Sequence, residues 1–179
     1  MNIVEFFELS SGKWFSQRTH HYLDSQQIKD GKSDLYIEKL PGDHPDVIEL
    51  CAQGNMDPKL ALFGVRSKWE GTIGTGKVKD SGITLLVTLS NPDSLTEGHF
   101  LQAANQAEQK PVVGRYSLGA DEALTLIWED EQSHAEERLW YASPNLRLRN
   151  SVIKQADGLK VAAFCSEIRM GGLPTPPSN

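Results

Sequence analysis

The segment that says most about the fold of this sequence is Glu136-Glu137-Arg138-Leu139-Trp140-Tyr141-Ala142-Ser143-Pro144-Asn145-Leu146-Arg147-Leu148-Arg149-Asn150-Ser151. It predicts two strands around a turn at Ser143–Asn145, with charge at alternate positions. Successive side chains of a strand point to opposite faces, so Arg147 and Arg149 share one face. If that face turns into a closed sheet, it makes a pocket for an anionic ligand. From the spacing alone, a solvated strand face with scattered salt bridges remains the alternative.

The length of the loop between these two strands decides which acidic residue joins the arginines. With an odd-length loop, Glu137 lies on the same face as Arg147 and Arg149, whereas an even-length loop places Glu136 and Trp140 there. The residue pattern alone leaves both registers open.

Length and composition predict one globular domain. The chain has 179 residues, of which 39% are hydrophobic and 23% charged, and its 15 glycines suit a fold with many turns. We expect a single domain over residues 1–170. The remaining residues, 171–179, are rich in proline and glycine and predict a flexible tail.

The charge balance and the cysteines exclude several classes of protein. A net charge of -6 argues against a general nucleic-acid binder, which normally presents a basic field. Cys51 and Cys165 could form one bridge, but two cysteines make no disulfide scaffold, and no His/Cys spacing resembles a metal site. The sequence contains no apolar run of the roughly 20 residues that a membrane helix requires. These features favour a cytoplasmic protein without a membrane span.

The hydrophobic periodicity predicts an all-β fold with two short helices. Helical spacing occurs over residues 3–9, after a cap at Asn2, and over residues 47–53. Extended segments are predicted over residues 14–23, 33–40, 63–71, 83–89, 98–104, 112–118, 123–129, 136–141, 146–153 and 159–168, with a first turn at Asp30-Gly31. Ten short strands joined by local turns can remove their exposed edges by closing into an antiparallel up-and-down barrel around a small ligand.

Several motifs in order resemble the S-type phycobiliprotein chromophore lyases, the CpcS/CpeS group. They include Gly12-Lys13-Trp14, residues 16–21, Glu137–Trp140, residues 143–149 and Phe164–Met170. The resemblance runs from about Phe6 to Met170. It implies a ten-stranded barrel like those of lipocalins and fatty-acid-binding proteins, from cyanobacteria or related plastids. It also implies that the protein attaches an open-chain tetrapyrrole, a bilin such as phycocyanobilin, to a cysteine of an apo-phycobiliprotein subunit.

The resemblance assigns functional roles to particular residues. It implies catalytic roles for Glu137 and Arg149, and ligand binding by Arg18, Trp69, Arg147 and Glu167. Guanidinium groups pair with carboxylates bidentately, which suits the two propionates of a bilin. Carboxylates can accept from pyrrole N–H groups, and indole rings offer broad faces, so Trp140 is a further candidate. The bilin is the bound substrate, and neither a further cofactor nor a metal is expected.

Three alternatives remain open at this stage. Glu167 could instead close a strand end through an ion pair with Arg169. His20 and His21 could assist proton transfer, but neighbouring residues on a strand face opposite ways, so the pair makes a poor metal site. At the level of function, the chain could be a non-catalytic bilin or fatty-acid carrier, or the inactive subunit of a two-protein lyase. A homodimer is also possible, but the sequence shows no interface.

Overall fold

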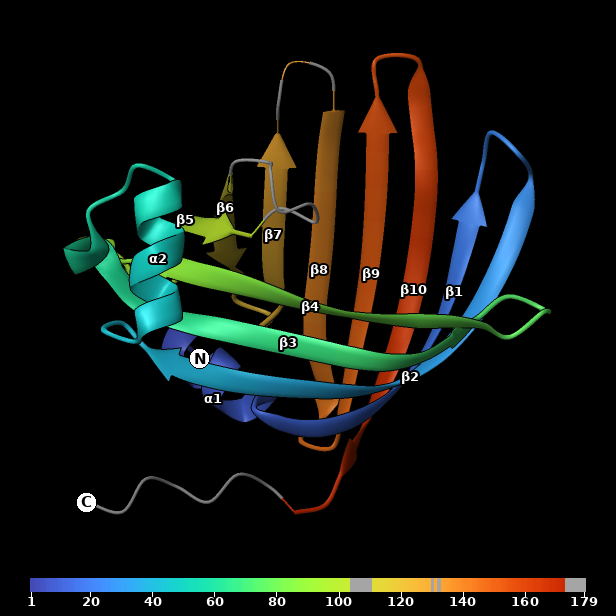
Figure 1. The fold of residues 1–179 in the computed structure, drawn as a ribbon, viewed down its shortest axis with the longest axis horizontal. Helices are drawn as coiled ribbons and strands as arrows, with labels where there is room; N and C mark the ends of the chain where they lie inside the picture. Colours follow the sequence, from blue (N-terminus) through green and yellow to red (C-terminus); the bar gives the residue numbers. More distant parts are fainter. Residues whose placement is uncertain (104–110, 130, 132, 173–179) are drawn as a thin grey trace.

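The computed structural model describes residues 1–103, 111–129, 131 and 133–172 of the chain. Within these residues, ten antiparallel strands close into one barrel, in the order β1-β10-β9-β8-β7-β6-β5-β4-β3-β2 (Figure 1). Strands β2, β3 and β4 cross in front of the steeper strands β8, β9 and β10. The predicted up-and-down barrel with two short helices is therefore confirmed.

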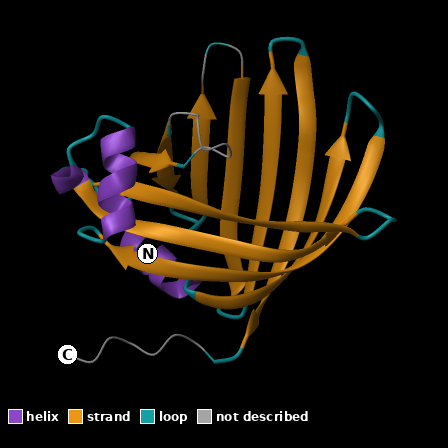
Figure 2. Ribbon diagram, viewed as in Figure 1, coloured by secondary structure: helices purple, strands orange, loops and turns teal. Residues whose placement is uncertain are grey.

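Strands occupy most of the chain, as Figure 2 shows. They are β1 (Gly12–Tyr22), β2 (Gln27–Pro41), β3 (Ala61–Ile73), β4 (Val78–Leu89), β5 (Glu97–Gln102), β6 (Val112–Leu118), β7 (Leu124–Glu129), β8 (Ser133–Ser143), β9 (Leu146–Gln155) and β10 (Gly158–Met170). The helices are α1 (Ile3–Ser10) and α2 (Pro45–Gln53), with a single 3-10 turn, η1, at Pro58–Leu60.

Helix α1 closes one end of the barrel. Asn2 begins it with a capping box: its Oδ1 accepts from the Glu5 amide at 3.0 Å, while the Glu5 carboxylate accepts from the Asn2 amide at 2.8 Å. The helix buries Phe6 and Phe7 in the main core, which includes Trp14 of β1. Trp14 also donates its indole N–H to the Ser10 carbonyl at 2.8 Å. The lumen is therefore filled with aromatic side chains at this end.

Helix α2 lies outside the barrel and covers part of its outer face. Its residues Val47, Leu50 and Cys51 form a second, smaller core with Val87 of β4 and Leu101 of β5. Cys51 and Cys165 are both free thiols, and they lie in different places, outside the barrel and in the wall of β10. Among the described residues, no helix is both long and apolar enough to cross a lipid bilayer.

Two predicted strand boundaries were wrong. Asp30-Gly31 is not a turn but part of β2, which already begins at Gln27. The chain reverses between Tyr22 and Gln27, where Gln26 has a φ of 53°. Strand β4 begins at Val78 and not at Ile83, so the β3–β4 hairpin is longer than expected. In both cases a glycine was interpreted as a breaker, although it lies opposite a large side chain: Gly31 is opposite Arg18, and Gly82 is opposite Trp69. Residues 173–179 of the expected tail, and Ala104 of the predicted fifth strand, lie outside the described residues.

Candidate functional site

The barrel contains a cavity of about 290 Å³, and Phe7 of α1 forms part of its lining. Its apolar wall comes from β2, β3, β4, β7 and β8, and includes Leu35, Trp69, Trp128 and Leu139. Its charged wall comes from β1, β8 and β9, and includes Ser16, Arg18, Glu137, Arg147 and Arg149. An interior with one apolar and one charged wall suits an amphipathic, anionic organic molecule.

A β-bulge brings Glu137 to the arginine face. Strand pairing places Tyr141 opposite Arg147 and Glu137 opposite Ser151, with a register shift between Tyr141 and Ser143. The turn itself has two residues, which by itself would favour the other register. The extra residue, Ala142, restores the register in which Glu137 and Arg149 both face the lumen.

Arg147 and Glu167 form a buried ion pair. They lie opposite each other on β9 and β10, and Arg147 Nε donates to Glu167 Oε2 at 2.6 Å. The two side chains are 3% and 0% exposed. Burial alone would raise the pKa of Glu167, but the charges of Arg147 and Arg149 outweigh burial and lower it. Glu167 is therefore a carboxylate that holds arginines and does not itself line the cavity.

Arg149 lies between two carboxylates. Its Nη1 is 3.5 Å from Glu137 Oε1, and its Nη2 is 3.6 Å from Glu167 Oε1. Nη2 is also 3.5 Å from the thiol of Cys165. Burial opposes the charged form of Arg149, but Glu137 and Glu167 raise its pKa well above the usual range. The guanidinium remains a fixed positive charge in the cavity wall.

Arg18 reaches along the barrel wall, over β2 and β3, to Asp80 of β4, with which it forms an ion pair. Its path runs over Gly31 of β2, where an added Cβ would lie 2.9 Å from Arg18 Nε. Burial lowers the pKa of Arg18, and among the described residues its buried Nε has no hydrogen-bond partner. A ligand acceptor could therefore use a donor that the protein leaves unpaired.

Trp69 lies flat over Gly82 of the neighbouring strand and lines the cavity. A Cβ at Gly82 would lie 2.3 Å from Trp69 Cζ2, so only glycine permits this position of the indole. Trp140, in contrast, lies on the outer face of β8, opposite Leu148, and does not line the cavity. The structure thus corrects the predicted ligand contact of Trp140, because the register that turns Glu137 inward turns its even-numbered neighbours outward.

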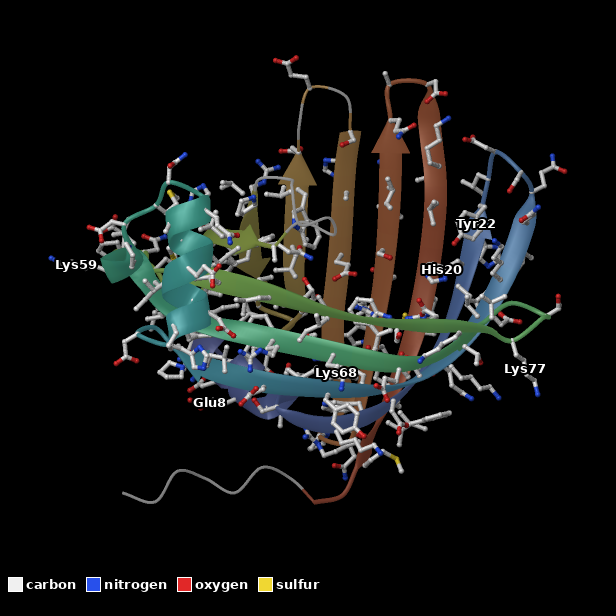
Figure 3. All side chains as sticks on the ribbon, viewed as in Figure 1. Glu8, His20, Tyr22, Lys59, Lys68 and Lys77 are labelled. Carbon is white, nitrogen blue, oxygen red and sulfur yellow. The ribbon has the colours of Figure 1, made fainter. Side chains whose placement is uncertain are left out.

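His20 lies inward on β1, two positions beyond Arg18 toward the β1–β2 hairpin (Figure 3). Its ring centroid is 6.1 Å from that of Tyr22. Burial lowers the pKa of His20, and the charges of Arg18 and Arg149 lower it further, so the imidazole is neutral at neutral pH. His21 is exposed. Within the part of the chain that the structure describes, no cluster of three or more His, Cys, Asp or Glu side chains could hold a metal ion.

The structure brings together five of the seven residues predicted for the site. Arg18, Trp69, Glu137, Arg147 and Arg149 line one cavity, while Glu167 lies behind the arginines and Trp140 lies outside. Arg169 does not pair with Glu167. It stacks on Trp14, with its guanidinium carbon 4.1 Å from the ring centroid, and donates to the Ser11 carbonyl at the end of α1.

Sequence reasoning missed several residues of the site, among them Asp80, which pairs with Arg18, and Ser16 and Trp128, which line the cavity. Asp80 was interpreted as part of a loop, because the pattern predicted that its strand began only at Ile83. For Ser16 and Trp128, the sequence pattern could not distinguish a residue that lines a cavity from one that packs in a filled core. Ser16 is opposite Glu167, and both Ser16 Oγ and Glu167 Oε1 are buried without a hydrogen-bond partner among the described residues. Ser16 and Glu167 meet only because β1 and β10 pair in this register, which the sequence around each residue does not show.

Comparison with known proteins identifies relatives over nearly the whole chain. Residues 2–170 match a family model described as CpeS-like protein. A protein of Thermosynechococcus vestitus named chromophore lyase CpcS/CpeS is 51% identical over 171 residues, which cover 96% of this chain and 94% of the relative. A Picosynechococcus protein named phycocyanobilin lyase subunit CpcS is 35% identical, with coverage of 93% and 85%.

The fold also has a solved counterpart. The structure of the S-type phycobiliprotein lyase CPES from Guillardia theta superposes with a TM-score of 0.81 at 30% sequence identity. The alignment covers 96% of this chain and 94% of that one.

Proposed function

Because this chain belongs to the CpeS-like family, we propose that it is a chromophore lyase that binds an open-chain bilin and promotes its attachment to a cysteine of a phycobiliprotein subunit. The observation that carries the proposal is the convergence of Arg18, Arg147 and Arg149 on one cavity that also contains Trp69. A bilin has two propionates, four ring nitrogens and a long conjugated body, and this cavity offers a matching group for each.

The arginines would hold the propionates. Each of the three guanidinium groups already pairs with a carboxylate of the protein, namely Asp80, Glu167 or Glu137. These pairs reduce the cost of burying the arginines before the bilin arrives. Guanidinium groups carry five donors in a planar fork, so each can keep its protein partner and still donate to a propionate.

Glu137 would stabilise the protonated tetrapyrrole. Of the acidic residues around the arginines, Glu137 lines the cavity and is partly exposed to it, with a side-chain exposure of 26%. A carboxylate there can accept from pyrrole N–H groups. Protonation of the pyrrolic system makes the bilin a better electrophile without a covalent intermediate on the lyase.

The reaction would be an addition without oxidation or reduction. The thiol sulfur of the acceptor cysteine forms a bond to the ethylidene carbon of ring A, and the thiol proton ends on the bilin. The acceptor protein provides the nucleophile, so the lyase needs none. Its contribution is to keep the bilin extended, with the reacting end at the barrel mouth.

We infer phycocyanobilin as the bilin, and a phycocyanin β or allophycocyanin-type subunit as the acceptor. The name of the Picosynechococcus relative supports the first part of this inference. An absorbance titration with phycocyanobilin, followed by mass spectrometry of an apo-subunit, tests both parts. We expect a saturable spectral shift and faster formation of the thioether adduct. No acceleration with any acceptor would refute the lyase and leave a bilin carrier.

A second candidate function follows from the name of the Picosynechococcus relative, which describes that protein as a lyase subunit. The chain could act only together with a homologous partner chain. In that case the purified protein would bind phycocyanobilin but would form the adduct only after co-expression with the partner.

A further inference from the structure

Ser16 presents a buried hydroxyl group to the cavity. The residue lines the cavity from β1, and only 2% of it is exposed. Within the described part of the chain, its Oγ has no hydrogen-bond partner. Most buried hydroxyl groups are paired, because an unmade hydrogen bond costs the desolvation of the group. A hydroxyl that faces a cavity without a partner therefore points to an acceptor on the ligand.

Strand register places Ser16 in a row of polar residues across four neighbouring strands (Figure 1). Ser16 is opposite Glu167 of β10 on one side and opposite Ser33 of β2 on the other. Glu167 is in turn opposite Arg147 of β9. We call these four residues the polar layer, and all four are buried. Ser16, Ser33 and Arg147 also line the cavity, so the polar layer is part of its wall.

The two serines of the polar layer leave room for a ligand. Two residues before Ser16 on the same face of β1, Trp14 is fully buried in the main core. Two residues after Ser16, Arg18 belongs to the charged wall. Ser16 and Ser33 thus provide small side chains where the aromatic core ends and the charged wall begins. A ligand group that passes the arginines reaches these serines before it meets the indole of Trp14.

Ser16 differs from the arginines of the cavity in the bonds that it already makes. Arg147 donates from Nε to Glu167 Oε2 at 2.6 Å, whereas the hydroxyl of Ser16 is bonded to none of the described residues. The other oxygen of Glu167, Oε1, is also unpaired among those residues, but Glu167 lies behind the cavity lining. The hydroxyl of Ser16 can therefore turn to a ligand without breaking a hydrogen bond of the protein.

We propose that Ser16 is a further ligand-binding residue, whose hydroxyl donates to a carboxylate oxygen of one bilin propionate beside Arg147. This role rests on the proposed function, because it concerns the ligand of the same cavity. A carboxylate offers about four lone-pair directions, so it can accept from a guanidinium and from a hydroxyl at the same time. A hydrogen bond to a charged acceptor is roughly twice as strong as a neutral one. Ser16 therefore favours a bilin with free propionates over the same bilin as an ester.

Absorbance titrations of wild type and Ser16→Ala, with phycocyanobilin and with its dimethyl ester, test this role. Loss of the hydroxyl should weaken binding of the free acid about tenfold to a hundredfold, the range for one hydrogen bond to a charged group. Binding of the ester should weaken by less than about threefold, because a neutral acceptor gains less from Ser16. The matched control is Ser81→Ala. Ser81 is an exposed serine of β4 outside the cavity lining, so this change should leave both affinities as they are.

Thermal melts without ligand separate a binding role of Ser16 from a structural one. Removing a buried hydroxyl that the protein leaves unpaired should keep the melting temperature unchanged or raise it. Removing a hydroxyl that is bonded within the protein should lower the melting temperature. We therefore expect Ser16→Ala to lose affinity for the free acid without losing stability, a combination that a purely structural residue would not show.

Three results would overturn the role of Ser16 and leave the proposed function intact. The first is an unchanged affinity of the Ser16→Ala variant for phycocyanobilin. The second is an equal loss of affinity for acid and ester, which would mean that Ser16 meets a part of the bilin other than a carboxylate. The third is a lower melting temperature of the variant, which would mean that the hydroxyl is bonded inside the protein. Wild-type protein that binds neither form of the bilin would refute the proposed function as well.

Discussion

Arg149 and Glu137 face each other in the cavity, and each is about a quarter exposed. Because neither is fully buried, we expect Arg149→Ala and Glu137→Gln to reduce bilin transfer much more than stability. The transfer rate should fall at least about tenfold, which corresponds to about 1.4 kcal/mol of transition-state stabilisation. Adduct formation and thermal melts measure the two effects separately.

The matched control for this pair is Arg138→Ala. Arg138 lies next to Glu137 on β8 but points outward. Its side chain is 46% exposed and pairs with Asp121. Its loss should leave transfer unchanged. Melting temperatures of the cavity variants that fall as far as their activity would instead make Arg149 and Glu137 structural.

Asp80 places a negative charge beside the Arg18 guanidinium to which a propionate would bind. Even if Arg18 keeps this ion pair and donates to the propionate through its other N–H groups, the two acids repel each other. Asp80→Asn removes the competing charge, so we expect phycocyanobilin to bind roughly threefold to tenfold more tightly, within the range of a partly exposed ion pair. An absorbance titration measures the change. Asp34→Asn, on the outer wall, is the control, and weaker binding by the Asp80 variant would show that Asp80 itself contacts the ligand.

Glu167 is fully buried between two arginines. Glu167→Gln leaves Arg147, which is 3% exposed, without its charged partner, and should cost about 3–5 kcal/mol of unfolding free energy. Because folding lowers the pKa of Glu167, the contribution of this residue to the free energy of unfolding decreases at acidic pH. The stabilisation is complete above the unfolded value near 4.5 and is lost as the pH falls through the lower folded value.

Denaturant titrations at pH 7 and at several values below 4.5 check both parts of this prediction. The difference between wild type and the Glu167→Gln variant should be largest at neutral pH and should shrink on acidification. A difference that stays constant across this range would mean that the charge of Glu167 does not contribute.

At the scale of elements, the bulge in β8 determines which residues face the arginines. Ala142 is the extra residue, and Tyr141 pairs with Arg147 beyond it. Deleting Ala142 removes the bulge but lets Ser143 follow Tyr141 directly, so Glu137 stays opposite Ser151. We therefore expect the deletion variant to bind phycocyanobilin within a few-fold of wild type. A loss of binding together with an intact melt would show that the bulge also shapes the cavity.

At the scale of the whole molecule, ligand binding and folding are linked because the cavity exists only in the closed barrel. Phycocyanobilin at a hundred times its dissociation constant should add about 2.7 kcal/mol of stability. For a chain of this size, that corresponds to an increase of roughly 5–10 °C in melting temperature. Differential scanning calorimetry at increasing bilin concentration measures the increase. An unchanged melt at this concentration would mean that phycocyanobilin does not bind the folded barrel in preference to the unfolded chain.

The sequence by itself determined the number and direction of the strands and both helices. It also determined that Arg147 and Arg149 lie on the same face of their strand. These features depend on side-chain alternation and local turn residues, which are properties of short segments. The sequence left open whether Glu137 or Glu136 joins those arginines, and it placed Trp140 at the site and Asp80 in a loop.

Only the tertiary structure decided these points. One unpaired residue in β8 exchanges the two faces of a strand, and such a bulge leaves no mark in the hydrophobic pattern. Asp80 meets Arg18 across 62 positions of sequence, because strands β1 and β4 are separated in the barrel wall only by β2 and β3, and Arg18 is long enough to span both. Contacts of this kind depend on the register of every strand between them, and no local segment determines that register alone.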